Sequence, residues 1–373
     1  MGKIFCKFNV CPAGITKIFK KIKNYTSKKD FDFNLIIGGD GTFLRYFHKI
    51  KNSKPFIFLR DKMSFGGLAE LNIEDFDVML KKILEKEYFI ENAMLLKVKK
   101  HFALNDIYIK HFDGSKSMMY EIETKNFYDR KIGDGIIFAT PQGSFGYTKS
   151  AGGPQVLLKR IVVTHISPFK YVKFENRIEK ANSENFQIFN EDEKIIFRLL
   201  WENANLYVDG RLVEKKIKPQ TKLKIKKAEK EAKIVRFFKK EFKFAVDAII
   251  EKDGKFLLAR RNYEPFKGKL ALIGGFIENN EKPINAIKRE LKEEVGLEVK
   301  SYREFKHYFE ANRDPRGNVY SIVFEIVPKK FEIKEGYEVY DADFYDIREL
   351  KPSDFAFDHW KILIDYLRWK GKL

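Results

Sequence analysis

Short apolar runs separated by polar, glycine-containing turns dominate the chain and predict many short strands. A buried strand is expected over residues 35–37, followed by the stretch "GGDGT" and a helical pattern that begins at Phe43. Another strand, over residues 136–139, leads into a loop rich in Gly, Ser and Thr. Such a loop offers backbone N–H groups and hydroxyls to an anionic or sugar-like ligand, although an ordinary surface loop has the same composition.

A helix is expected in the last third of the chain. Ile284, Ile287, Leu291 and Val295 recur at helical spacing and predict a buried face, and Gly296 is expected to end the helix. Three glutamates, at positions 290, 293 and 294, have the i, i+3 and i+4 spacing that places them on one face. Clustered carboxylates repel one another unless cations neutralise them, and hard oxygen ligands suit Mg²⁺ or Mn²⁺. A solvated acidic helix face is the alternative.

The charge distribution divides the chain. The 373 residues carry a net charge of +19, yet residues 243–373 contain 25 Lys and Arg against 24 Asp and Glu. The length favours two domains, and we expect residues 1–237 and 243–373, with a hairpin turn at Asp253-Gly254 soon after the boundary. A basic domain suits nucleic acid or small polyanions. Lysines that alternate with apolar residues, as in "TKLKIKK", favour solvated strand faces, and no RNA-binding motif is present, so nucleic acid is not an expected partner.

Membrane and secretory classes are not expected. The chain has no apolar run of 18 residues, and its start, "MGKIFCKFNV", reads as a strand rather than a signal peptide. Two cysteines, Cys6 and Cys11, are too few for a disulfide framework. The sequence therefore predicts a cytoplasmic protein.

Four motifs occur in the order found in NAD kinases: "GGDGT", "ALND", "DGIIFATPQGSFGYTKSAGGP" and "VDG". Residues 1–237 resemble that family, which implies an α/β nucleotide-binding subdomain followed by a β-rich subdomain. The resemblance implies that Asp40 is the general base for the 2′-OH of the adenosine ribose of NAD. It also implies that ATP or polyphosphate donates the phosphoryl group. The nucleotide-binding residues that it implies are Gly38, Gly39, Gly41, Thr42, Asn105, Asp106, Asp134, Ser144, Tyr147 and Asp209.

Two departures from the family pattern bear on activity. The pair at 105–106 is Asn-Asp where the family usually has Asn-Glu, and Phe145 replaces a polar residue. A phenylalanine cannot hydrogen-bond adenine but can stack on it.

The segment from Gly275 to Leu297 contains a complete Nudix box and resembles the Nudix hydrolases, which implies an α+β domain with an α/β/α sandwich. The resemblance implies metal-assisted attack of water on a diphosphate. Arg289 would orient a metal-binding glutamate, and Glu281 would support the metal shell. The implied metal ligands are Glu290, Glu293, Glu294 and the backbone carbonyl near Gly274.

Segments outside the Nudix box indicate the identity of the substrate. "EANRDPRGNVYSIVF" and "AFDHWKIL" resemble ADP-ribose pyrophosphatases. Arg313 and Arg316 could contact a diphosphate or ribose, or could lie on an exposed turn. His359 could be a packed side chain or a ligand contact.

The whole sequence therefore predicts a bifunctional enzyme of NAD metabolism. One domain would convert NAD to NADP, and the other would hydrolyse ADP-ribose to AMP and ribose 5-phosphate. One alternative is a pyrophosphatase of NAD(H) or another nucleotide, regulated by a non-catalytic NAD-binding domain. The partners are expected to be small-molecule nucleotides, and the chain is expected to form a homo-oligomer, a dimer or a tetramer.

Overall fold

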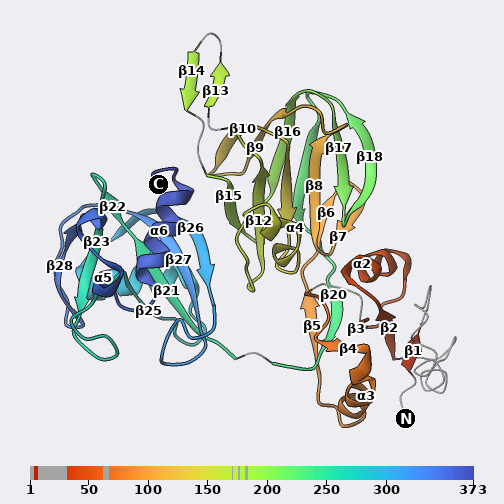
Figure 1. Cartoon of the computed structure of the whole chain (residues 1–373), viewed down its shortest axis with the longest axis horizontal. Coiled ribbons are helices and arrows are strands. Elements are labelled where there is room, and N and C mark those ends of the chain that lie inside the picture. Colours follow the sequence, from red (N-terminus) through yellow and green to blue (C-terminus); the bar gives the residue numbers. More distant parts are fainter. Residues whose placement is uncertain are drawn as a thin grey trace. The chain divides into compact units, whose positions relative to one another are not determined.

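The computed structural model describes residues 4–6, 32–61, 67–169, 171–174, 177–180, 184–239 and 241–373. The chain divides into two compact units (Figure 1). The first comprises Met1–Arg177 and Asn190–Lys239, and the second comprises Ile178–Phe189 and Lys240–Leu373. Cys11 lies outside the described residues. Among the residues described, no helix is long and apolar enough to cross a membrane.

A mixed sheet with strand order β1-β2-β3-β20-β5 begins the first unit, and β4 pairs with β3. All neighbouring pairs are parallel except β20 and β5. The predicted strand over residues 35–37 is confirmed as part of β2. The strands are β1 (Ile4–Cys6), β2 (Phe33–Ile37), β3 (Phe56–Arg60), β4 (Leu71–Asn72), β5 (Phe89–Ala93) and β20 (Ala232–Arg236).

Two helices pack in separate apolar cores of this sheet. Phe43 of α2 (Asp40–Lys49) packs with Ile36, and Met79 of α3 (Phe76–Leu84) packs with Leu35. Because neighbouring side chains of a strand point to opposite faces, α2 and α3 cover opposite faces. This explains why β2 is apolar without alternation.

The β-rich part of the first unit contains two antiparallel sheets (Figure 1). One has the order β10-β9-β16-β19-β6-β7, and the other contains β12-β11-β8-β17-β18. The predicted lysine alternation is confirmed in β19, where Leu223 and Ile225 are buried and Lys222 and Lys224 are exposed. The elements are β6 (Leu96–Val98), β7 (His101–Ala103), β8 (Asp106–His111), β9 (Met118–Glu123), β10 (Tyr128–Gly133), β11 (Gly135–Ala139), α4 (Tyr147–Ser150), β12 (Arg160–Ile166), β16 (Ile195–Trp201), β17 (Ala204–Val208), β18 (Arg211–Ile217) and β19 (Lys222–Lys227).

The second unit contains two four-stranded sheets, β25-β21-β27-β26 and β22-β23-β24 with β28 paired to β23. The predicted hairpin is confirmed: Asp253 and Gly254 both have positive φ, and β22 pairs with β23. The predicted helix is confirmed as α5, and Gly296 ends it at φ 67°. The elements are β21 (Lys243–Ile249), β22 (Glu251–Lys252), β23 (Lys255–Arg261), β24 (Leu270–Ala271), β25 (Ile273–Phe276), α5 (Pro283–Val295), β26 (Val299–Tyr308), β27 (Val319–Pro328), β28 (Val339–Tyr345) and α6 (His359–Trp369).

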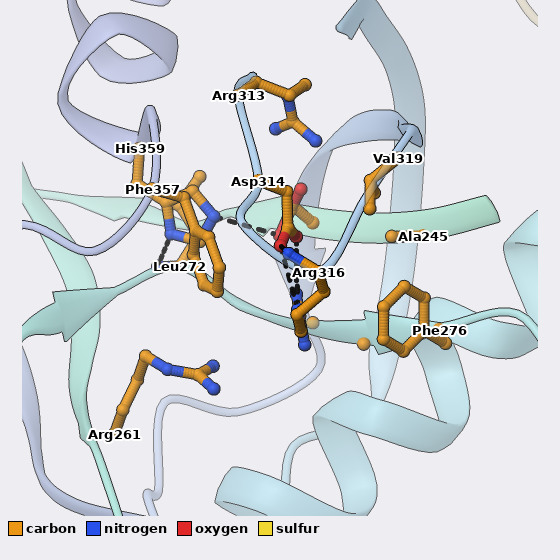
Figure 2. Close-up of a pocket in the computed structure, with 13 residues that line it drawn as sticks. Ala245, Arg261, Leu272, Phe276, Arg313, Asp314, Arg316, Val319, Phe357 and His359 are labelled. Carbon is orange, nitrogen blue, oxygen red and sulfur yellow. Dashed lines mark hydrogen bonds and ion pairs between the residues drawn. The ribbon is translucent and has the colours of Figure 1, made fainter. Parts of the chain in front are cut away.

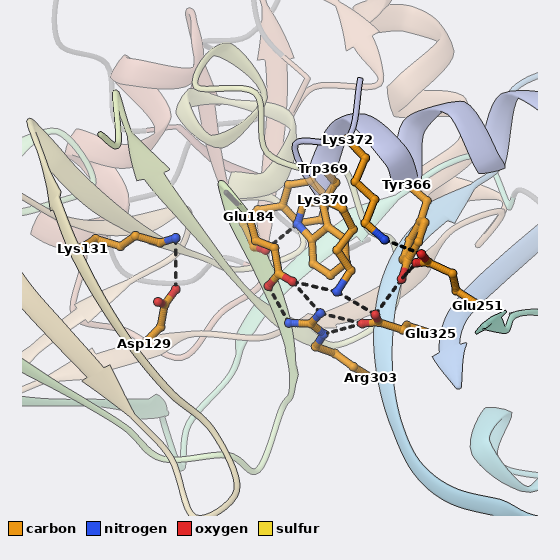
Figure 3. A network of polar contacts seen from close by, with 11 residues as sticks. Asp129, Lys131, Glu184, Glu251, Arg303, Glu325, Tyr366, Trp369, Lys370 and Lys372 are labelled. Atoms are coloured by element: carbon orange, nitrogen blue, oxygen red, sulfur yellow. Dashed lines mark hydrogen bonds and ion pairs between the residues drawn. The ribbon is translucent and has the colours of Figure 1, made fainter. Parts of the chain in front are cut away.

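Residues 178–189, although distant in sequence from residue 240, belong to the second unit. Phe186 stacks on Phe305 and on Trp369, whose indole N–H donates to the Phe186 carbonyl at 3.1 Å. Glu184 accepts hydrogen bonds from Arg303 (Figure 3). The chain leaves and re-enters the first unit through β13 (Tyr171–Phe174), β14 (Arg177–Lys180) and β15 (Phe186–Asn190).

The fold class expected from the sequence, an α/β subdomain with a β-rich subdomain followed by an α+β domain, is confirmed.

Candidate functional sites

Asp40 lies where β2 ends and α2 begins. Its carboxylate accepts hydrogen bonds from the backbone N–H of Gly67 at 3.0 Å and of Leu68 at 3.3 Å. Burial raises the pKa of Asp40, and these two backbone hydrogen bonds oppose that rise. A carboxylate with a raised pKa is a better proton acceptor than a solvated one.

Gly38, in the loop before Asp40, is required to be glycine for steric reasons. Gly38 has φ 150°, and a Cβ atom there would lie 2.9 Å from the Thr42 side chain. Gly41 has open space around it and is exposed. The loop therefore presents backbone to solvent beside Asp40, with Gly39 as the N-cap of α2.

Asp209 fixes the turn that carries Asn105 and Asp106. Its buried carboxylate accepts hydrogen bonds from the backbone N–H groups of Leu104 at 2.9 Å, Asn105 at 2.8 Å and Asp106 at 3.1 Å. It also contacts His48 Nε2 at 2.7 Å. Asp209 thus acts through its neighbours, as a positioning residue.

Asn105 and Asp106 are buried and their polar groups are incompletely satisfied. The Oδ1 atom of Asn105 has no hydrogen-bond partner among the described residues. Burial, and then the charge of Asp209, raise the pKa of Asp106 to about 7. A buried polar atom without a partner is costly, so this turn is suited to a polar ligand.

The loop after β11 packs directly on this turn. The Thr140 N–H donates to the Asn105 carbonyl at 2.8 Å, and a Cβ atom at Gly143 would lie 2.0 Å from the same oxygen. Ser144 is fully buried, and its hydroxyl donates to the Pro141 carbonyl at 2.6 Å and accepts from the Val156 N–H at 3.0 Å. In this structure Ser144 holds the loop rather than facing solvent.

The same loop is linked to Asp40. Gln142 donates to Glu91 at 2.7 Å, Glu91 accepts from Arg236 at 2.6 Å, and Arg236 donates to the Leu68 carbonyl at 2.8 Å. A Cβ atom at Gly67 would lie 4.0 Å from Cβ of Phe145, which is 37% exposed. The structure therefore brings together three of the predicted motifs around Asp40, Asn105 and the 140–147 loop.

Tyr147 contributes to an aromatic cluster that the sequence motifs do not reveal. Its ring packs edge-on against Tyr108 with centroids 5.4 Å apart, and Tyr108 stacks on Tyr207 at 4.6 Å. Tyr108 and Tyr207 are opposite each other on paired strands. The register needed to predict this pair is not visible in the sequence.

Asp134 lies apart from Asp106. Strand β11 pairs Ala139 with Asp106 at one end and Gly135 with Lys110 at the other. Asp134 directly precedes that second end, is exposed, and accepts a hydrogen bond from Ser117 Oγ at 3.2 Å. Within one chain, Asp134 and Asp106 therefore lie at opposite ends of β11.

In the second unit, Arg289 organises the acidic face of α5. It donates to both carboxylate oxygens of Glu281, at 3.2 and 3.0 Å, and to Glu290 at 2.7 Å. The bonds to Glu281, chiefly, raise the pKa of Arg289, so its positive charge is permanent.

The three glutamates of the helix are not equivalent. Glu290 and Glu294, one turn apart, are buried, whereas the Glu293 side chain is 60% exposed and contacts Arg289 at 3.3 Å. Burial, with the charge of Glu290 next, raises the pKa of Glu294 to about 8, and burial raises the pKa of Glu290. A divalent cation bound between these two buried carboxylates would reduce the repulsion between their negative charges.

Two glycines lie against these carboxylates. A Cβ atom at Gly275 would lie 2.4 Å from Glu290 Oε1, and the Gly274 N–H donates to Glu294 at 3.2 Å. In the described parts of the chain, no three His, Cys, Asp or Glu side chains are already grouped as a metal site. The oxygen donors and the open backbone fit a hard cation, because such ions use carboxylate, carbonyl and water ligands.

A small cavity next to β25 is lined by three arginines (Figure 2). Arg313, with 5% of its side chain exposed, donates to both oxygens of Asp358 at 3.0 and 2.6 Å, and Arg316 is paired with Asp314 at 2.7 Å. Arg313 therefore does not lie on an exposed turn. His359 is buried at the cavity wall and accepts a hydrogen bond from the Leu272 N–H at 2.9 Å.

Arg261 is the residue of this cavity that sequence reasoning missed. Its Nε donates to the Pro265 carbonyl at 2.8 Å, and its guanidinium lies over the Phe357 ring at 4.9 Å. Burial, and then the charge of Arg316, lower the pKa of Arg261. It also lines an adjoining cavity of about 90 Å³ together with Glu294. The charge of Arg316 disfavours that of Arg261, so the space beside Arg261 is suited to an anion.

Comparisons with known proteins match each region separately. Residues 104–237 match the model of the ATP-NAD kinase C-terminal domain, and residues 241–366 match that of the NUDIX domain. An NAD kinase of Fusobacterium nucleatum is 30% identical over 260 residues, which cover 63% of this chain and 92% of that protein. An ADP-ribose pyrophosphatase of Methanocaldococcus jannaschii is 48% identical over 127 residues, 34% of this chain and 74% of that protein.

A solved structure of an NAD kinase from Archaeoglobus fulgidus in complex with ATP is also similar to the chain. It shares 26% identity over 63% of this chain and 92% of that one, with a TM-score of 0.48.

Proposed function

Because the chain belongs to the NAD kinase family in its first part and to the Nudix family in its second, we propose that it is a bifunctional enzyme of NAD metabolism. The first unit transfers a phosphoryl group to the 2′-OH of NAD and gives NADP. The second unit hydrolyses ADP-ribose to AMP and ribose 5-phosphate. ATP or polyphosphate is the phosphoryl donor.

In the kinase reaction, Asp40 accepts the proton of the attacking 2′-OH. The hydroxyl oxygen forms a bond to the terminal phosphorus of the donor, and the bond from that phosphorus to the leaving oxygen breaks. Gly39 and Gly41 place backbone N–H groups beside the donor phosphates. The N–H groups of Gly38 and Thr42 donate to the carbonyls of Leu59 and Gly39 and hold the loop in shape. Asn105 and Asp106 hydrogen-bond the dinucleotide, and Asp209 holds their turn in place.

In the hydrolysis, Glu290, Glu293, Glu294 and the Gly274 carbonyl would hold Mg²⁺ or Mn²⁺, which lowers the pKa of bound water and neutralises phosphoryl oxygens. Arg289 fixes Glu290 and Glu281 in place through its hydrogen bonds. Arg261 and Arg316 orient the diphosphate by charge. Arg313, fully engaged by Asp358, supports the loop that carries Arg316.

One observation carries the proposal: each unit places half-buried or buried carboxylates of raised pKa beside glycine backbone, Asp40 in the first and Glu290 with Glu294 in the second. Such carboxylates beside open backbone are typical of sites that bind phosphate groups and transfer protons or hold cations.

The test is direct. Purified protein is incubated with Mg²⁺ and NAD plus ATP, with Mg²⁺ and NAD plus polyphosphate, and with Mg²⁺ and ADP-ribose, and products are identified by chromatography. We expect NADP in at least one of the first two reactions and AMP in the third. NAD that binds without being phosphorylated would favour the alternative, a regulatory NAD-binding unit. Cleavage of another nucleotide in place of ADP-ribose would overturn the proposed substrate.

The proposal includes a homo-oligomer, a dimer or a tetramer. If Asp134 and Asp106 contact the same sugar of the dinucleotide, a second copy has to supply Asp134, because the length of β11 separates the two residues within one chain. Light scattering coupled to size exclusion measures the mass in solution, and a monomer that makes NADP would contradict this part. A cytoplasmic location is also proposed, supported by the presence of only two cysteines, and cell fractionation tests it.

A further inference from the structure

The first unit contains a cavity that lies away from Asp40. It has a volume of about 370 Å³ and is lined by the end of α2, the loop that follows it, and the turn into β20. This volume lies in the range of about 300–1,000 Å³ that is usual for small-molecule sites. Asp40 begins α2 and His48, near its other end, lines the cavity, so about eight residues of helix, about 12 Å, separate the two places.

Four lysines from two distant chain segments meet at this cavity: Lys51 and Lys54 after α2, and Lys230 and Lys233 around the start of β20. All four are exposed, and in the described ranges none is paired with a carboxylate. The single acidic residue of the lining, Glu231, already accepts a hydrogen bond from Lys159 at 2.6 Å. Four like charges around one hollow repel one another, and a bound anion removes that repulsion.

The position of these lysines distinguishes them from the other lysines of the unit. Lys222 and Lys224 are also exposed, but they alternate with buried residues along β19 and do not line this cavity. Aromatic side chains form the remainder of the cavity wall, including Phe47 and Phe102, and the Lys230 ammonium lies 3.8 Å from the centroid of the Phe102 ring.

From these observations we propose that the cavity binds a small polyanion of the polyphosphate class and that its occupancy is coupled to the Asn105–Asp106 turn. Two lining residues provide the connection. His48 contacts the buried carboxylate of Asp209 at 2.7 Å, and Asp209 holds the backbone of residues 104–106. Phe102 lies in β7, which leads directly into Leu104. An anion that shifts either residue changes the turn as well.

Lysine footprinting tests the binding itself. The full chain is acetylated in EDTA, with and without inorganic tripolyphosphate, and the modified lysines are quantified by mass spectrometry. We expect tripolyphosphate to protect Lys51, Lys54, Lys230 and Lys233 but not Lys222 or Lys224. Protection of all six to the same degree would indicate unspecific charge attraction and overturn the proposal, as would the absence of protection.

A matched pair of variants makes the test quantitative. In Lys230→Ala/Lys233→Ala, the tripolyphosphate concentration that half-protects Lys51 and Lys54 should rise by about tenfold, equivalent to 1.4 kcal/mol. The control, Lys222→Ala/Lys224→Ala, removes the same charge from β19 and should leave this midpoint unchanged within about twofold. If the half-protecting concentration rose equally in both variants, the effect would depend only on net charge, which would overturn the proposal. All of these variants change exposed side chains, and circular dichroism checks that they fold.

The coupling step rests on the proposed function, and NAD binding by calorimetry tests it. At the tripolyphosphate concentration that half-protects Lys51 and Lys54 in the wild type, the dissociation constant of NAD should change in the wild type and in Lys222→Ala/Lys224→Ala. It should change much less in Lys230→Ala/Lys233→Ala, because coupling between two sites requires both to be occupied. The same change in all three proteins would mean direct competition at the NAD site and would overturn the coupling. If NAD does not bind at all, the proposed function fails, and the lysine protection still decides whether the cavity binds the polyanion.

Discussion

Glu294 is the carboxylate of α5 with the most strongly altered environment. It is buried, it faces the charge of Glu290, and it accepts a hydrogen bond from the Gly274 N–H. We predict that Glu294→Gln lowers ADP-ribose hydrolysis by about 100-fold or more while NADP formation is retained, because the amide keeps the shape but loses the charge that binds a cation. AMP release against metal concentration measures this. Glu298→Gln, a neutralisation on the exposed end of the same region, is the control, and AMP release at the wild-type rate from folded Glu294→Gln would exclude the role.

The pKa of Glu294, about 8, makes metal binding depend on pH. A protonated carboxyl group has to release its proton before it binds a cation. We therefore expect the Mg²⁺ or Mn²⁺ affinity of the second unit to rise with pH between about 6 and 8, by up to about tenfold per pH unit, and then to level off. Calorimetric titrations at several pH values measure the affinity. In Glu294→Gln the steep rise should be lost, and a wild-type affinity that stays constant over this range would contradict the prediction.

Asp106 should make the first unit less stable as the pH rises. Its pKa is about 7 in the folded protein and its ordinary value is 3.8, so the folded state holds the proton more tightly than the unfolded state. The unfavourable contribution of Asp106 to the free energy of unfolding therefore grows from about pH 4 to about pH 7 and stays constant above pH 7. We expect Asp106→Asn to raise the free energy of unfolding at pH 8 by about 1–4 kcal/mol, with a smaller gain at pH 5. Urea unfolding at both pH values measures this, and an equal effect at both would contradict it.

The sequence alone can predict the role of a residue when that role depends on residues adjacent in the chain. Asp40, Asn105 and the glutamates of α5 stand in motifs, and the structure places them at the two candidate sites. Arg261 and His48 could not be found in this way, because their partners come from distant segments: Arg316 and Phe357 for Arg261, and Asp209 for His48.

At the scale of elements, the close approach of the 140–147 loop to the Asn105 turn leads to a sharp prediction. A methyl group at Gly143 would lie 2.0 Å from the Asn105 carbonyl oxygen, whereas at Gly146 it would lie at an ordinary 3.5 Å from the Gly143 carbonyl. We expect Gly143→Ala to lower NADP formation by about 100-fold, the order of loss that a displacement of about 1 Å causes. AMP release from ADP-ribose should be unchanged. Gly146→Ala is the control and should retain most of the activity, and equal kinase activities of the two variants would show that the loop tolerates the shift.

Local patterns predict elements well where periodicity and capping agree. The hairpin at residues 253–254 and the helix that ends at Gly296 follow from turn chemistry and spacing alone. The α2 helix begins at Asp40, three residues before the apolar pattern starts, because its first turn follows the glycine loop rather than the core. The pattern also could not show that Glu293 would be exposed while Glu290 and Glu294 are buried.

At the scale of the whole molecule, the assignment of residues 178–189 could not be predicted. The charge shift near residue 240 indicates where one chain segment gives way to another, but it does not indicate which core a strand within the first segment will join. Phe186 belongs to the apolar core of the second unit with Phe305 and Trp369, and these contacts span more than a hundred residues of sequence. The second unit is therefore completed by a segment that precedes it, and fragments that begin near residue 241 lack part of their core.

Glu184 provides a test of this segment's contribution to stability. Its carboxylate is almost fully buried and is bound by Arg303 at both oxygens and by Lys370 at 3.1 Å (Figure 3). We predict that Glu184→Gln lowers the free energy of unfolding of the second unit by about 1–3 kcal/mol, because charge-assisted hydrogen bonds are lost while Arg303 stays largely buried. Glu298→Gln removes one charge from the exposed pair with Lys329 and should cost less than about 1 kcal/mol. Calorimetry of thermal unfolding compares the stability of the two variants with that of the wild type. If both variants unfold at the wild-type temperature, the buried ion pair of Glu184 does not stabilise the unit. If a fragment of residues 241–373 unfolds at that same temperature, the segment as a whole contributes no stability to the second unit.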